Sequence, residues 1–266
     1  MAAELKAALS DLAIAPGETL AGAYLSTDES PCDTENRLFT NPGTSSFPRN
    51  VAAIRWERGV GPPPPSPAPI ESVAGHVYYY RYRIDAEFEW WEPANTLARW
   101  TRVPRQLAHD GSARPMWLAM KRAAAAGAVE RTGAAHDARA PFGIRVVVHA
   151  TAHGPRSAPA ISEALIDGVI AAFHGSAPNV AAVAAALAPR MPSVAQSEIE
   201  MLVAADAPTP IFVSSPFVVA GSFVQISPHD ERCFAGEVSI RRDSAGPVVE
   251  TSGEIVTLSR VRHDLQ

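Results

Sequence analysis

The chain has 266 residues, of which 47% are hydrophobic and 19% charged, with a formal net charge of −5. This composition predicts a globular protein with a sizeable core, and the charge argues against general binding to nucleic acid or to anionic membranes. Charge or proline interrupts every apolar run before the ~20 residues that a membrane span needs, and residues 1–14 lack signal-peptide features. With only Cys32 and Cys233, the simplest expectation is the reducing cytoplasm. Abundant alanine, arginine and proline with little lysine are typical of a GC-rich bacterial genome.

The first half of the chain predicts mainly strands. Helical spacing over 3–13 is followed by strands at 19–26 and 51–57, and the Pro-rich run 59–69 predicts a loop, since proline removes donors. Residues 76–91 alternate aromatic with charged side chains, which predicts one long half-buried strand with a bend. We expect 97–107 to return as its antiparallel neighbour.

The second half predicts helices between strands. Pro115 begins a helix that runs to about Ala126, and a strand of buried type follows at 142–153. Three further helices are expected at 161–173, 179–187 (capped by Asn179) and from Ser193 to about Ala205, where Ser193-Val-Ala-Gln196 has the form of a capping box. The predicted closing strands are 217–226, 233–241 and 248–258, and a turn at Asp243–Pro247 joins the last two as a hairpin.

The order of these elements predicts an α+β fold, with a mainly antiparallel sheet and helices grouped around 112–127 and 160–205. Two parts are expected, 1–141 and 142–266, which can also form one continuous domain.

Sequence motifs for nucleotide binding, zinc proteases and serine hydrolases are absent, so acidic clusters are the main candidates for chemistry. Asp33 and Glu35 lie in the loop after the first strand and could bind a hard cation such as Mg²⁺ or Mn²⁺; the alternative is a polar turn. His229-Asp230-Glu231 precedes the strand that contains Cys233, where a metal ligand or general base is well placed, and again a turn is the alternative.

The histidines His149 and His153 are weaker candidates. On one strand they stand ~13 Å apart, which is too far for one metal ion.

Residues 97–145 form a local basic island. A solvated surface is one interpretation, and contact with a phosphate-containing or acidic partner is the other, because the arginine fork suits bidentate recognition. The arginines proposed for that contact are Arg99, Arg102, Arg105, Arg114 and Arg122.

Residues 142–240 resemble the RusA-type Holliday junction resolvases, through a strand, the helix ending Leu165-Ile-Asp-Gly-Val-Ile-Ala-Ala-Phe173, and Asp230-Glu231 before a strand. The resemblance implies Mg²⁺ held by an Asp-x-Asp-Asn motif at the helix start and by the acidic pair. At the helix start this chain has Ala160-Ile-Ser162-Glu163, and Ile166 replaces the family's lysine. Asp33-Thr-Glu35-Asn36 matches the acidic motif better, but Pro42-Gly43 soon after it predicts that no helix follows.

Three functions are therefore open. The first is a metal-assisted hydrolase, directed at phosphodiesters or nucleic acid, with Asp33, Glu35, Asp230 and Glu231 as ligands and His229 as a catalytic candidate. The second is a non-catalytic interaction or assembly module using the long strand and the Pro-rich loop. The third is a small-molecule enzyme with an aromatic pocket lined by Tyr78–Tyr82 or Trp90-Trp91.

Overall fold

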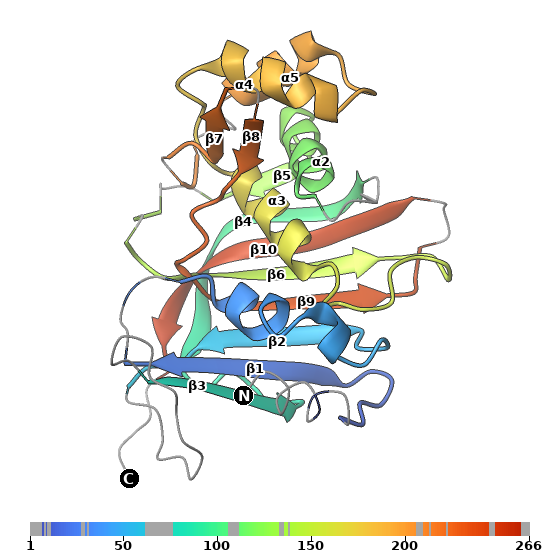
Figure 1. The fold of residues 1–266 in the computed structure, drawn as a ribbon, viewed down its shortest axis with the longest axis vertical. Helices are drawn as coiled ribbons and strands as arrows, with labels where there is room; N and C mark the ends of the chain where they lie inside the picture. Colours follow the sequence, from blue (N-terminus) through green and yellow to red (C-terminus); the bar gives the residue numbers. More distant parts are fainter. Residues whose placement is uncertain are drawn as a thin grey trace.

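The computed structural model describes residues 7, 9, 12–27, 30, 32–61, 77–105, 112–132, 136–137, 139–205, 210–212, 214–221, 223–244 and 248–261. Eight strands form one sheet in the order β3-β1-β2-β9-β6-β10-β4-β5, and β7 and β8 form a separate hairpin. Most pairs in the large sheet are antiparallel, whereas β1/β2 and β6/β9 are parallel. The fold is therefore α+β, as the sequence predicts (Figure 1).

The strands are β1 (Thr19–Ser26), β2 (Ala53–Arg58), β3 (Tyr78–Ile84), β4 (Trp91–Arg105), β5 (Val129–Arg131), β6 (Phe142–His149), β7 (Phe217–Ala220), β8 (Phe223–Ile226), β9 (Cys233–Arg241) and β10 (Val249–Arg260). The helices are η1 (Asn36–Thr40), η2 (Thr44–Ser46), α2 (Arg114–Ala125), α3 (Ser162–Ala172), α4 (Val180–Leu187), η3 (Ala188–Arg190) and α5 (Gln196–Ala204).

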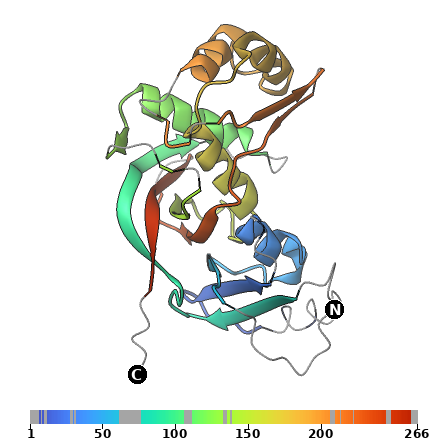
Figure 2. The same ribbon diagram turned by 90° about the vertical axis from the view of Figure 1, so that its left-hand side faces the viewer.

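The helices gather on one face of the large sheet and leave the other face open (Figure 2). The three tryptophans Trp56, Trp100 and Trp117 are fully buried between these layers. Helices α2 and α3 cross closely at Gly168, where an added Cβ would lie 2.5 Å from the Ala113 carbonyl oxygen and 2.6 Å from Met116 Cβ. Only glycine allows this approach, so the crossing fixes α3 against α2.

The prediction of one long strand over 76–91 is wrong. Strand β3 ends at Ile84, and Asp85 takes a positive φ of 52° while its carboxylate accepts the Thr19 N–H at 2.8 Å. The chain turns there, and β4 begins only at Trp91. Strand β3 pairs with β1, whereas β4 pairs with β10 and β5, so the two segments are not neighbours.

The predicted hairpin between the last two strands is also wrong, because β6 lies between β9 and β10. The cause lies just after β9. Arg242 donates to the carbonyls of Thr151 and Pro155, both at 2.6 Å, and Asp243 contacts His149. Residues 242–243 thus bind the segment at the end of β6 instead of folding back on β9, and the chain crosses β6 before it enters β10.

Several helix predictions are confirmed. Helix α2 begins beside Pro115, α3 covers the predicted range, and the Asn179 side chain caps α4 by accepting the Ala182 N–H at 3.1 Å. The capping box at Ser193 is wrong, since α5 begins after Ala195 without a side-chain cap. The helix over 3–13 and the loop over 59–69 lie largely outside the described residues.

The expected division near residue 141 stays a prediction, and strands from both sides of it share the large sheet. Within the described residues, no helix is long and apolar enough to cross a membrane.

Candidate active site

The acidic motif after β1 opens a short helical segment, contrary to the expectation that Pro42-Gly43 would prevent one. Residues 34–40 are helical, and Asp33 caps them by accepting the Asn36 backbone N–H at 2.9 Å. Leu38 and Phe39 are buried against β1 at Gly22, which anchors the segment to the sheet. The helical segment that follows Asp33 lies on the covered face of the sheet, near the start of α3 (Figure 1).

The second acidic segment reaches the same place from the other end of the chain. Asp230 lies in the loop that enters β9, and its carbonyl accepts the Cys233 N–H at 2.7 Å. The neighbouring His229 N–H lies 3.4 Å from Nε2 of His174, a fully buried histidine just after α3. Burial lowers the pKa of His174 to about 4. His174 is therefore neutral at physiological pH, and its Nδ1 donates to the Ser214 carbonyl at 2.8 Å, leaving Nε2 as the acceptor that holds this loop.

The third carboxyl group belongs to Asp167 in the middle of α3, which the sequence analysis does not select. A signal for it exists, because Asp167 is the single charged residue in Ala164-Leu-Ile-Asp-Gly-Val-Ile-Ala-Ala-Phe173. A charged side chain on an otherwise apolar helix needs a specific reason to be there.

These three carboxyl groups contact one another. Asp33 and Asp230 share a hydrogen bond, and Asp167 shares one with Asp230. Burial raises the pKa of all three, and the negative charge of Asp33 raises the pKa of Asp167 and of Asp230 further. A hydrogen bond between carboxyl groups requires a proton, so the carboxylate cluster (Asp33, Asp167 and Asp230) retains protons well above the usual carboxyl range.

Glu35 connects the acidic motif to the start of α3. Its carboxylate accepts a hydrogen bond from Ser162 Oγ, and both side chains are buried. Burial raises the pKa of Glu35 well above its usual value, and the nearby charge of Asp33 adds to this. The chain thus brings Asp33-Thr-Glu35-Asn36 to the start of α3, although the two segments are far apart in sequence.

The donor chemistry of the carboxylate cluster suits a hard cation. Mg²⁺ and Mn²⁺ prefer carboxylate and amide oxygens. Asn36 offers such an amide oxygen, since its Oδ1 is buried without a hydrogen-bond partner in the described part of the chain. The carboxyl oxygens at present bind one another, and among the described residues no three His, Cys, Asp or Glu side chains are arranged to hold a metal ion. Cation binding therefore requires the carboxyl groups to release their shared protons and turn.

Two of the predicted site residues lie apart from this arrangement. His229 and Glu231 are substantially exposed and face each other, with His229 Nδ1 3.5 Å from Glu231 Oε1. The ring of His229 also lies 5.7 Å from that of His174. Of the four ligands predicted from the sequence, the structure brings Asp33, Glu35 and Asp230 together and leaves Glu231 at the surface.

His149 does not pair with His153, which is exposed. It forms a hydrogen-bonded chain on the open face of the sheet, with Nδ1 2.8 Å from Asp243 and Nε2 2.9 Å from Ser252 Oγ. The order serine, histidine, carboxylate resembles a nucleophilic triad. However, Ser252 Oγ also accepts the Arg102 N–H at 3.0 Å, and the chain ties β6 to β10. We interpret it as structural.

The aromatic face of residues 78–82 packs on the core. Tyr80 lies 5.4 Å from Tyr24 between ring centroids, and Tyr82 lies 6.2 Å from Phe39. The charged face is paired within the chain, since Arg81 and Arg83 both bind Glu89 at 2.7 Å. These side chains therefore pack on the core and its edge, and an aromatic pocket lined by Tyr78–Tyr82 or Trp90-Trp91 stays a prediction.

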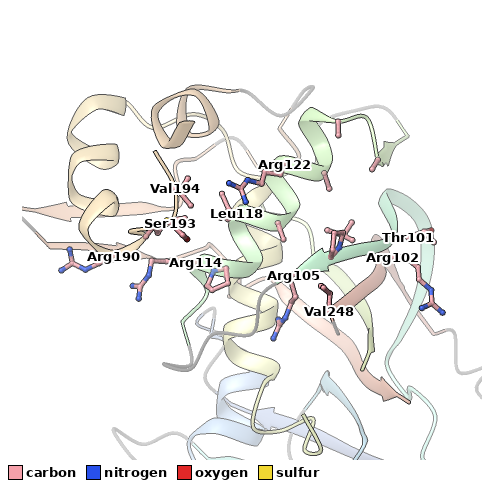
Figure 3. A pocket seen from close by; sticks show the side chains of 18 of the residues that line it. Thr101, Arg102, Arg105, Arg114, Leu118, Arg122, Arg190, Ser193, Val194 and Val248 are labelled. Atoms are coloured by element: carbon pink, nitrogen blue, oxygen red, sulfur yellow. The ribbon is translucent and has the colours of Figure 1, made fainter. Parts of the chain in front are cut away.

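The five predicted arginines of the basic island lie in two separate places in the structure. Arg99 pairs with Glu254 at 2.9 Å on the open face of the sheet. The other four predicted arginines, Arg102, Arg105, Arg114 and Arg122, line one pocket together with Arg190 (Figure 3).

No family model matches the chain, and no match is found among curated proteins or solved structures.

Proposed function

We propose that this protein is a divalent-cation-dependent phosphodiester hydrolase, with Asp33, Asp167 and Asp230 as the cation ligands. The observation that carries the proposal is the meeting of three partly buried carboxyl groups from three segments that are distant in sequence. Burying one ionised carboxylate without a partner is costly, and burying three beside each other is more costly still. Proteins place such groups together mainly where their charge is used.

None of the main causes of the pKa shifts of Asp33, Asp167 and Asp230 is a positive side chain of the described residues. The cluster therefore needs either protons or a cation to neutralise it. A divalent cation would supply the missing positive charge, polarise a phosphoryl oxygen and lower the pKa of a bound water. Mg²⁺ and Mn²⁺ are the best candidates, because the donors are all oxygen atoms.

The remaining residues of the site keep the carboxyl groups in place. Ser162 fixes Glu35, and so the acidic motif, against the start of α3. His174 holds the loop that carries Asp230. Asn36 donates to Asp33 from its side chain and from its backbone. Asp33 and the loop of Asp230 are thus held by neighbouring groups, and Asp167 is positioned by helix α3, as a site of defined geometry requires.

The choice of a phosphodiester substrate rests on the resemblance to RusA-type resolvases. In that family an acidic motif at a helix start and an acidic residue before the next strand hold Mg²⁺ for phosphodiester hydrolysis. Asp33-Thr-Glu35-Asn36 beside Ser162, and Asp230 before β9, have a similar relation in space. The absence of the family's lysine, with Ile166 at its position, leaves the neutralisation of the substrate's charge mainly to the cation.

The test compares three isosteric variants at pH 8. Asp167→Asn and Asp230→Asn should remove the rise in melting temperature caused by Mg²⁺ or Mn²⁺ and lower hydrolysis of a labelled branched DNA by about 1,000-fold or more. Glu231→Gln, which changes an exposed carboxylate of the same loop, should keep both properties. Hydrolysis of bis(p-nitrophenyl) phosphate separates a general phosphodiesterase from a DNA-specific one.

A protein whose melting temperature is insensitive to both cations, with Asp230→Asn as active as the wild type, would contradict the proposal. If the cation stabilises the protein but neither substrate is cleaved, the cation site stands and the phosphodiesterase assignment fails.

A further inference from the structure

A second charged site lies on the other side of α2. An open pocket of about 920 Å³ lies between the end of β4, one face of α2, the segment before α5, and Val248. Its size is within the range of small-molecule sites. Its floor is apolar and includes Val103, Leu118, Ala119 and Val194. Within the described residues, every charged side chain that lines it is an arginine (Figure 3).

Arg105 is the most informative of these arginines. Its guanidinium is partly buried at the end of β4, where Nη1 lies 3.8 Å from the Met116 sulfur and the buried Nε has no hydrogen-bond partner among the described residues. No carboxylate of the described chain pairs with it. Burial lowers the pKa of Arg105 to about 10, so it is still a cation at neutral pH. A partly buried cation with an unpaired, buried Nε–H donor favours binding of an anion.

Two neighbouring arginines are already partly neutralised. Arg122 pairs with Glu198 at 2.7 Å, and Arg102 pairs with Glu250 at 2.9 Å. Both side chains are about half exposed, with 49% and 42% of their surface accessible. They can therefore add long-range attraction at the mouth of the pocket, whereas the deeper Arg105 is the candidate for direct contact.

The apolar floor restricts the kind of anion. Inorganic phosphate would leave Leu118 and the alanines of α2 exposed to water. A nucleobase would find no aromatic ring to stack on, because none of the described lining residues is aromatic. A flexible aliphatic body instead covers such a surface and gains binding free energy with each buried methylene.

We propose that this pocket binds an amphiphilic organic anion, with its phosphate or carboxylate group at Arg105 and its aliphatic body on the α2 floor. The proposal does not depend on the hydrolase function, since it concerns a different face of α2 and needs no divalent cation.

The experiment titrates the full chain, without divalent cations, with butyl, hexyl and octyl phosphate below their micellar concentrations. We expect the affinity to rise by up to about fourfold per added methylene, which is the gain for burying one CH₂. Octanoate tests whether the site prefers phosphate or carboxylate. Inorganic phosphate and octanol test each half of the ligand alone, and both should bind at least about tenfold more weakly than octyl phosphate.

Two variants locate the site. Arg105→Met keeps the length of the side chain and removes its charge, and it should weaken octyl phosphate at least about tenfold, since hydrogen bonds to a charged group are lost. Leu118→Gln should weaken octyl phosphate more than butyl phosphate. Arg156→Met, at an exposed arginine outside the pocket, should change neither affinity.

Four results would overturn the proposal: equal affinity for inorganic phosphate and octyl phosphate, equal affinity for octanol and octyl phosphate, unchanged binding by Arg105→Met, or displacement of octyl phosphate by a single-stranded 20-mer DNA that binds more tightly. The last result would assign the arginines to a nucleic-acid surface. If Arg105→Met fails to fold, the chain-length series on the wild type and Leu118→Gln decide the question.

Discussion

The carboxylate cluster and the arginine pocket pose the same electrostatic problem with opposite signs. Each gathers like charges in a partly desolvated place, and in neither do the described residues neutralise all of the charge. Their chemistry differs in one respect. A buried carboxylate can take up a proton near neutral pH, whereas arginine keeps its proton far above it. The acidic site can therefore exist without a ligand by holding protons, and Arg105 has no such alternative.

This difference predicts how each site responds to its surroundings. The carboxylate cluster should exchange protons for a cation, so that its ligand binding depends on pH. The arginines of the pocket should keep their charge near neutral pH, so that any pH dependence of binding there comes from the ionisation of the anion itself. Helices α2 and α3 connect the two sites. Three changes to the chain test how each site contributes to stability and to ligand binding.

The largest effect is expected from Gly168→Val at the crossing of α2 and α3. The new side chain would meet the Ala113 carbonyl and Met116 at distances that no packed structure tolerates, so the helices must separate. Overpacking of this kind should cost about 3 kcal/mol of unfolding free energy and weaken ligand binding at both sites. Chemical denaturation measures the loss of unfolding free energy, and titration with Mg²⁺ and with octyl phosphate measures binding at the two sites.

The control for this crossing is Ala125→Val on the exposed part of α2, which should cost only about 0.5 kcal/mol through lower helix propensity. Equal losses in the two variants would show that the close approach at Gly168 has no special role. A loss of binding at one site alone would show that the crossing supports that site only.

A smaller effect is expected from pH acting on the carboxylate cluster. The pKa of Asp167 and of Asp230 is raised in the folded protein, which therefore binds more protons than the unfolded chain above about pH 4. Stability conferred by these protons is present at low pH and is lost as pH rises through the raised pKa range. Without divalent cations, we expect a loss of about 2 kcal/mol between pH 5 and pH 9, measured by urea denaturation.

The double variant Asp167→Asn/Asp230→Asn removes the titrating groups and should flatten this dependence, while Glu231→Gln should keep it. Mg²⁺ should stabilise the wild type more at pH 8 than at pH 5, because protons compete with the cation at low pH. A double variant with the same slope as the wild type would assign the pH dependence to other groups.

The local features of the fold can be predicted from the sequence, whereas the long-range features cannot. The alternation and apolar content at 19–26, Pro115 at a helix start and the cap at Asn179 are local, and the structure confirms each of them. The α+β class also follows from the order of such elements. The break at Asp85 and the insertion of β6 between β9 and β10 depend on tertiary hydrogen bonds, which periodicity does not contain.

The candidate site shows the same division. Asp33 and Asp230 were found as acidic residues in loops, but their contact spans most of the chain and could not be deduced from spacing. Asp167 was missed because a single aspartate in a helix has no motif. Glu231 follows Asp230 directly, but it lies in the turn closed by the Asp230 carbonyl and the Cys233 N–H, and its carboxylate faces His229. The members of the cluster are defined by tertiary contacts between their carboxyl groups, which residue type and local spacing do not contain.

The smallest effect is expected from Arg105→Met in the absence of any ligand. This variant tests directly whether the arginine pocket, like the carboxylate cluster, contains charge that the chain does not neutralise. If Arg105 is a buried cation without a partner, replacing it by an apolar side chain of similar length removes a desolvation cost. We expect the variant to be as stable as the wild type or more stable by about 1 kcal/mol, with no change between pH 6 and pH 8. A loss of 2 kcal/mol or more in urea denaturation would show that Arg105 holds the fold through its own contacts. In that case the arginine pocket, unlike the carboxylate cluster, would be neutralised from within the chain.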